Sequence, residues 1–145
     1  MIRRIAWLIS AVGVLIFAGA TAMLLSDASH VRVPAITALV TFAAIVLAHL
    51  GGIEWGLALR DESGTEMTRA IALGLASVSS LAAWGVLWLP SPQWQVGAAL
   101  GLFVAVGGAD LWFSRHGLLP SWFVDLRTAV TAIVAVILGI ALYLL

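Results

Sequence analysis

The feature that most constrains this chain is a series of five long apolar runs, at about residues 5–25, 35–59, 70–89, 95–113 and 128–145. A helix rises about 1.5 Å per residue, so about 20 apolar residues cross a hydrocarbon core about 30 Å thick. Only 10% of the 145 residues are charged, whereas a soluble domain carries about 25%. The sequence therefore predicts an all-α fold: a polytopic membrane bundle of five transmembrane helices, forming a single domain over residues 1–145.

The arginines predict how this bundle is oriented. Cytoplasmic loops of membrane proteins are enriched in basic residues. By the predicted spans, only Arg32 lies on the side opposite the N-terminus, and six arginines lie on the N-terminal side: Arg3, Arg4, Arg60, Arg69, Arg115 and Arg127. We therefore expect the N-terminus inside and the C-terminus outside, in a multi-pass protein of the bacterial inner (cytoplasmic) membrane. Residues 118–127, between the last two spans, could form an interfacial segment.

Two of the predicted helices contain a carboxylate after a glycine pair. Glu54 follows Gly51 and Gly52, and Asp110 follows Gly107 and Gly108. Each acid is followed by a tryptophan, by an arginine at the helix end and by a second arginine before the next helix: Trp55, Arg60 and Arg69 in one segment, and Trp112, Arg115 and Arg127 in the other. Either a duplication or chance explains this similarity. In both cases the acids lie about 8–9 Å from the inner arginine, at matched depth.

An ionisable side chain in hydrocarbon is costly and normally has a partner. Glu54 and Asp110 could pair with arginines that reach inward, which would be a structural role. They could instead line a site for a proton, a cation or a polar head group, or meet the inner head groups through helix tilt. We expect Arg127 or Arg69 within hydrogen-bonding reach of one of the two acids.

His49 is the third polar residue of this region. It lies about 140° from Glu54 around a helix, so the two should not face the same partner. Packing and ligand binding are both open for this histidine. We predict no metal site, because the candidate ligands diverge and no spacing typical of helical metal sites occurs.

Small residues suggest close helix packing. Glycines at spacings of four allow the backbones of membrane helices to approach. The predicted packing positions are Gly51, Gly52, Gly56, Gly97, Gly101, Gly107 and Gly108.

Two segments resemble a known family. Residues 50–58 (Leu-Gly-Gly-Ile-Glu-Trp-Gly-Leu-Ala) and 119–131 (Leu-Pro-Ser-Trp-Phe-Val-Asp-Leu-Arg-Thr-Ala-Val-Thr) are similar to motifs of the domain-of-unknown-function family that includes transmembrane protein 69. The chain departs from that pattern at Glu54, where the family more often has His or Arg. The resemblance implies a small bacterial inner-membrane protein with mitochondrial relatives, and it implies no reaction.

Three function classes follow. The sequence contains no nucleophile–base pair, phosphate-binding loop or dinucleotide motif, so we expect neither an enzyme nor a cofactor. The zero net charge predicts no nucleic-acid partner.

The favoured hypothesis is a non-catalytic accessory, assembly or stabilising component of a larger, energy-transducing membrane complex, with other membrane subunits as partners. The alternative is a binder or carrier of a proton, ion, lipid or quinone that uses His49, Glu54 and Asp110.

Overall fold

The computed structural model describes residues 1–60 and 64–145 of the chain. Five α-helices and no strands occur in these residues: α1 (Ile2–Met23), α2 (Ser29–Ala58), α3 (Glu66–Val86), α4 (Pro92–Arg115) and α5 (Ser121–Leu144). By length and composition, each of the five is long and apolar enough to cross a membrane. The predicted all-α fold with five membrane-span-capable helices is confirmed, and the orientation of the termini stays a prediction.

All five helices begin before the apolar runs do, and the difference is largest for α2 and α5. α2 starts at Ser29 and continues through Pro34, which precedes the apolar run. The fixed φ of proline suits a helix, and its ring removes only one intrahelical hydrogen bond. α5 starts at Ser121, directly after Pro120 at its N-cap. The expected interfacial segment at 118–127 is therefore mostly the first two turns of α5.

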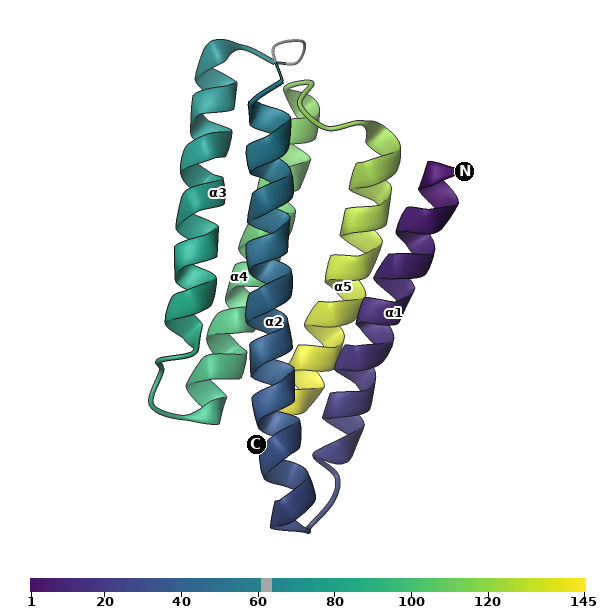
Figure 1. Cartoon of the computed structure of the whole chain (residues 1–145), viewed down its shortest axis with the longest axis vertical. Helices are drawn as coiled ribbons and strands as arrows, with labels where there is room; N and C mark the ends of the chain where they lie inside the picture. The colour runs from purple at the N-terminus through teal and green to yellow at the C-terminus, as the bar shows by residue number, and fades with distance from the viewer. Residues whose placement is uncertain (61–63) are drawn as a thin grey trace.

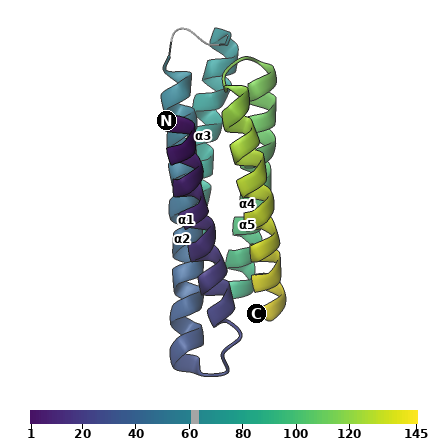
Figure 2. The same cartoon turned by 90° about the vertical axis from the view of Figure 1, so that its right-hand side faces the viewer.

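The helices form two layers. α1, α2 and α3 lie in one layer, and α4 and α5 cover its inner face (Figures 1 and 2). α2 packs against α1, α3 and α4, while α5 packs against α1 and α4. The N-terminus lies toward the end of the bundle that holds the α4–α5 connection, and the C-terminus lies toward the other end (Figure 1).

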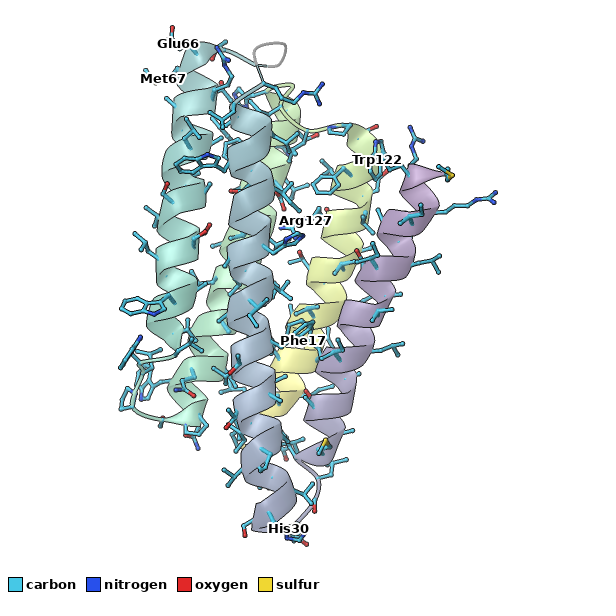
Figure 3. The ribbon with its side chains drawn as sticks, in the orientation of Figure 1. Phe17, His30, Glu66, Met67, Trp122 and Arg127 are labelled. Atoms are coloured by element: carbon cyan, nitrogen blue, oxygen red, sulfur yellow. The ribbon has the colours of Figure 1, made fainter. Side chains whose placement is uncertain are left out.

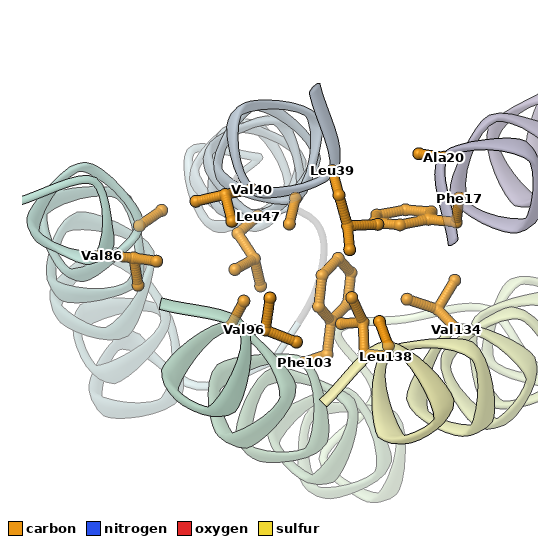
Figure 4. Packing of buried hydrophobic residues seen from close by; sticks show 14 of the residues in the cluster. Phe17, Ala20, Leu39, Val40, Leu47, Val86, Val96, Phe103, Val134 and Leu138 are labelled. Carbon is orange, nitrogen blue, oxygen red and sulfur yellow. The ribbon is translucent and has the colours of Figure 1, made fainter. Parts of the chain in front are cut away.

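The centre of the bundle is built from aromatic and branched side chains. Phe17 of α1 lies between Phe42 of α2 and Phe103 of α4, with ring centroids 5.0 and 5.8 Å away. Val134 and Leu138 of α5 belong to the same cluster, and Val86 of α3 extends it, so all five helices contribute to it (Figure 4). Ring contacts of this kind contribute about 0.5–1.5 kcal/mol each beyond their buried area.

Arg32 joins two helices at the end of the bundle that lies away from the N-terminus. Its Nη1 donates to the carbonyl of Leu24, 3.1 Å away, and its Nη2 donates to the carbonyl of Leu144. These carbonyls belong to the ends of α1 and α5, where the helix dipole favours a cation. The single arginine on this side therefore joins two helix ends.

α1 packs along only part of its length. Its buried residues, Phe17, Ala20 and Thr21, all lie in its last third. Nearer the N-terminus α1 diverges from α2 but stays beside α5 (Figure 1), where the guanidinium group of Arg3 lies 5.6 Å from the ring centroid of Trp122. This divergence leaves room between the three helices, and the candidate site lies there.

Candidate functional site

The best-defined polar contact inside the bundle joins α4 and α5. Nε and Nη2 of Arg127 both donate to Oδ2 of Asp110, at 2.8 and 2.7 Å. Arg127 is 7% exposed and Asp110 is 2% exposed. In Figure 3, Arg127 points from α5 toward the space between α5 and α2. This is the type of arginine contact that the sequence predicted.

Glu54 of α2 completes an acid–arginine layer, the name we use for Glu54, Asp110 and Arg127. Its carboxyl group lies close enough to Asp110 and to Arg127 to interact electrostatically with both. Glu54 is 4% exposed, and its Oε1 is buried without a hydrogen-bond partner in the described part of the chain. The layer therefore places two acids against a single arginine.

A glycine one turn before each acid brings the neighbouring helix close. A Cβ atom on Gly51 would lie 2.7 Å from Oγ of Ser80 and 2.8 Å from the carbonyl oxygen of Ala76, both on α3. A Cβ atom on Gly107 would lie 3.0 Å from Cγ2 of Thr131 on α5. These two glycines therefore set the spacing of α2 to α3 and of α4 to α5 beside the acids.

The other predicted packing glycines have free space around them. No atom lies within 4 Å of a Cβ built on any of five positions: Gly52, Gly56, Gly97, Gly101 and Gly108. These glycines contact no neighbouring helix in the described part of the chain. They form strips without side chains on α2 and α4.

A cavity of about 340 Å³ lies between α1, α2 and α5 and extends to Phe103 of α4. Its walls are mostly apolar side chains, including Phe17, Phe42 and Val134. The polar groups on its wall come from three helices: Ser10 of α1, His49 of α2, and Arg127 and Thr131 of α5. The cavity is thus an apolar space with a few polar groups on its wall.

His49 and Glu54 lie on different faces of α2, as their spacing predicts. Glu54 lies on the buried face with Leu47, Leu50 and Gly51. His49 is exposed on the outside of the helix and borders the cavity. Arg127 is the residue that belongs to both the cavity wall and the acid–arginine layer.

A second cavity, of about 490 Å³, lies next to the first toward the α4–α5 connection. The two cavities share Ile53 and Phe123 on their walls. Arg60 and Trp122 also line this second cavity. Together the two cavities extend along the space between α2 and α5, from Trp122 and Phe123 near the α4–α5 connection to the centre of the bundle.

The remaining predicted site residues lie away from the acids. Nη1 of Arg69 donates to the carbonyl of Arg60 at 3.3 Å, and Arg115 is exposed at the end of α4. Trp55 and Trp112 are 46% and 37% exposed. These four side chains therefore do not form part of the acid–arginine layer.

Trp112 has a local partner. Its ring lies 4.1 Å from that of His116, centroid to centroid, and its carbonyl oxygen lies 2.8 Å from Nδ1 of the same histidine. In the described residues, no three His, Asp or Glu side chains lie close enough together to hold a metal ion. The chemistry available here is thus hydrogen bonding, charge pairing and proton binding.

Sequence reasoning missed the cavity and the residues of α1 that line it. Gly13 and Ser10 border the cavity, yet neither stands out in an apolar helix of ordinary composition. The spacing of small residues in α1 was the available signal. It does not show whether a helix packs against its neighbours or diverges from them.

Comparison with known proteins shows that the chain matches one protein family. A family model described as a protein of unknown function matches residues 2–143. No curated protein and no solved structure matches the chain. A function must therefore be argued from the geometry described above.

Proposed function

The chain belongs to the DUF3429 family of proteins of unknown function, and we propose that it is an integral membrane protein that binds a lipid-like amphipathic molecule between α1, α2 and α5. The observation that carries the proposal is the cavity of about 340 Å³, which has an apolar wall interrupted by Arg127 and His49. Binding sites for small molecules are typically apolar cavities of about 300–1,000 Å³ with a few convergent polar groups.

The distribution of wall residues supports an amphipathic ligand. Phe17, Phe42 and Phe103 surround the part of the cavity nearest the bundle centre, and an acyl or isoprenoid chain would find apolar contacts there. Arg127 and Thr131 supply hydrogen-bond donors on α5 for a head group. A wholly apolar ligand would leave the remaining N–H donors of Arg127 without a ligand acceptor, so the wall fits a molecule with one polar end.

The divergence of α1 supports access from the bilayer. On α1 the cavity wall extends from Ile9 to Phe17, and Phe17 is the first buried residue of the helix. A chain of a lipid could therefore enter sideways between α1 and α2. The second cavity, beside Trp122, extends the same space toward the end of the bundle.

Photolabelling tests this function. An oleoyl lipid that carries a diazirine in its acyl chain is incorporated with the protein in vesicles and activated, and the labelled peptides are mapped by mass spectrometry. We expect labels on the cavity residues of α1 and α5. Gly13→Leu should reduce this labelling, because Gly13 borders the cavity and has free space for a side chain.

Gly19→Leu is the matched control. Gly19 is on the same helix and also has no atom within 4 Å of a built Cβ, but it is not on the cavity wall. Labelling that is uniform over the lipid-facing surfaces and unchanged by Gly13→Leu would contradict the proposed function.

A second candidate is the accessory or assembly subunit expected from the sequence. It is favoured by the glycine strips on the outer faces of α2 and α4, where Gly52, Gly56 and Gly101 leave room for a further helix. Substitution of these glycines by leucine should abolish copurification of partner subunits in a mild detergent. Recovery of the native protein without partners would count against this role. Kinship with transmembrane protein 69 and location in the bacterial inner membrane stay predictions.

A further inference from the structure

We propose that the cavity ligand carries an anionic oxygen head group, which replaces Asp110 as the ion-pair partner of Arg127. Binding of this ligand is coupled to the uptake of one proton by the Asp110–Glu54 pair. This inference rests on the proposed function, because it names the head group of the cavity ligand. It makes the acid–arginine layer the part of the protein that senses an occupied cavity.

The first step concerns the donors of Arg127. A guanidinium group has five N–H donors, and Nε and Nη2 both point to the same oxygen of Asp110. Donors therefore remain on a side chain that also forms part of the cavity wall. An oxygen-bearing head group in the cavity can accept them. Paired N–H donors of arginine match carboxylate and phosphate oxygens in geometry and in charge.

The second step concerns the sign of the charge. Of the described residues on the cavity wall, Arg127 is the only one with a permanent charge. The acids Glu54 and Asp110 are absent from that wall and lie behind the guanidinium group. α1 contributes no titratable side chain to the wall, and α2 contributes His49. A head group that approaches through the cavity thus meets a cation first, which favours an anion.

The third step is the proton balance. When the head group takes Arg127, Asp110 loses its cation while it stays next to Glu54. Beside Gly51, one turn before Glu54, α3 presents the uncharged Ser79 and Ser80. A buried carboxylate without a partner is costly. Asp110 therefore takes a proton from hydronium or from the buffer acid in bulk solution: the donor's bond to the proton breaks, an O–H bond forms on Asp110, and Arg127 then pairs with the anionic ligand.

Calorimetry tests the coupling directly. The full-length protein in lipid nanodiscs is titrated with oleate, with oleoyl lysophosphatidate and with oleyl alcohol, and the heats for empty nanodiscs are subtracted. We expect at least one of the two anions to bind about 10- to 100-fold more tightly than the alcohol, the effect of charge-assisted hydrogen bonds. The anion that binds more tightly identifies the head group as carboxylate or phosphate. Titration in buffers of different ionisation enthalpy should give an uptake of about one proton per bound oleate.

Variants of the ion pair separate charge from proton uptake. Asp110→Asn should retain oleate binding and lose the proton uptake. The double variant Arg127→Gln/Asp110→Asn removes both charges with little change of volume. It should lose the preference for anions, so that oleate and oleyl alcohol bind with similar affinity. Asp125→Asn, which removes an exposed carboxylate on α5, should change neither quantity.

The outcomes distinguish the two proposals. If oleyl alcohol and oleate bind equally well, or if anions bind without proton uptake, the inference is overturned and the cavity still binds amphiphiles. If none of the three probes binds, and Gly13→Leu leaves photolabelling unchanged, the proposed function itself fails.

Discussion

Arg127 of α5 donates through both Nε and Nη2 to a single oxygen of Asp110, at 2.8 and 2.7 Å, while Glu54 of α2 lies close enough to interact electrostatically with both. The ion pair therefore joins α4 to α5 beside α2. Because Arg127 also lines the cavity, the contact that stabilises the bundle is also the one that a ligand would disturb.

Removal of the arginine alone should be strongly destabilising. Arg127→Gln leaves Asp110 buried beside a second acid, and breaking a buried ion pair costs about 3–5 kcal/mol. The double variant Arg127→Gln/Asp110→Asn should recover most of this loss, because no uncompensated charge remains. Reversible unfolding of the wild type, Arg127→Gln, Asp110→Asn and the double variant in mixed detergent micelles measures the coupling energy between the two residues. Additive losses in the double variant would show that the two residues act independently.

Gly51 should tolerate no side chain. In Gly51→Ala the new methyl group would lie 2.8 Å from the backbone oxygen of Ala76 and 2.9 Å from Oγ of Ser79. Because a backbone atom cannot move aside as a side-chain end can, α2 and α3 must separate. Overpacking of this kind costs about 1–3 kcal/mol, measurable by thermal unfolding.

Gly52→Ala is the adjacent control, since no atom lies within 4 Å of its built Cβ. Alanine is the better helix former by about 1 kcal/mol in water, so this variant should be neutral or slightly more stable. Equal destabilisation by the two substitutions would refute the close approach of α2 and α3 at Gly51.

Gly107→Ala should have a smaller effect that a second substitution reverses. Its methyl group would meet the side chain of Thr131 at 3.0 Å. A side chain can shift more easily than backbone, so we expect a loss of about 1 kcal/mol. Thr131→Ala in the same protein removes the contacted methyl and should restore stability. Gly108→Ala, in free space, serves as the control, and a loss there as large as at Gly107 would contradict this account.

The predicted orientation can be tested by cysteine labelling. The chain has no cysteine of its own, so single-cysteine variants have no background signal. With the N-terminus inside, Asp27→Cys should react with an impermeant maleimide in intact cells, whereas Glu66→Cys and Arg115→Cys should react only after the membrane is opened. The reverse pattern would show that the arginine bias does not set the topology.

The sequence could predict the helices and the faces of α2 because these follow from local rules. Run length and composition indicate spans, and the helical repeat places His49 and Glu54 on different faces. The matched depth of Glu54 and Asp110 was readable too, and the structure brings the two acids together. Choosing between Arg127 and Arg69 as their partner was not possible, because the two hold equivalent positions, each just before the next predicted helix.

Helix starts were less predictable, and polar residues are the reason. Arg127 was placed outside the last span because a charge is unfavourable in hydrocarbon. In the structure α5 begins at Ser121, and Asp110 compensates that charge from α4. A local hydropathy rule does not include such a partner.

Taken alone, the sequence determined that this chain is helical, that five of its segments can span a membrane, and that two acids lie at one depth. Those properties depend on residue type and on the fixed geometry of a helix. Tertiary structure decided that Gly51 and Gly107, among seven similar glycines, meet a neighbouring helix. It also decided that α1 diverges to leave a cavity beside Arg127. These features depend on how helices pack against one another, and helix packing is set by the shapes of whole surfaces.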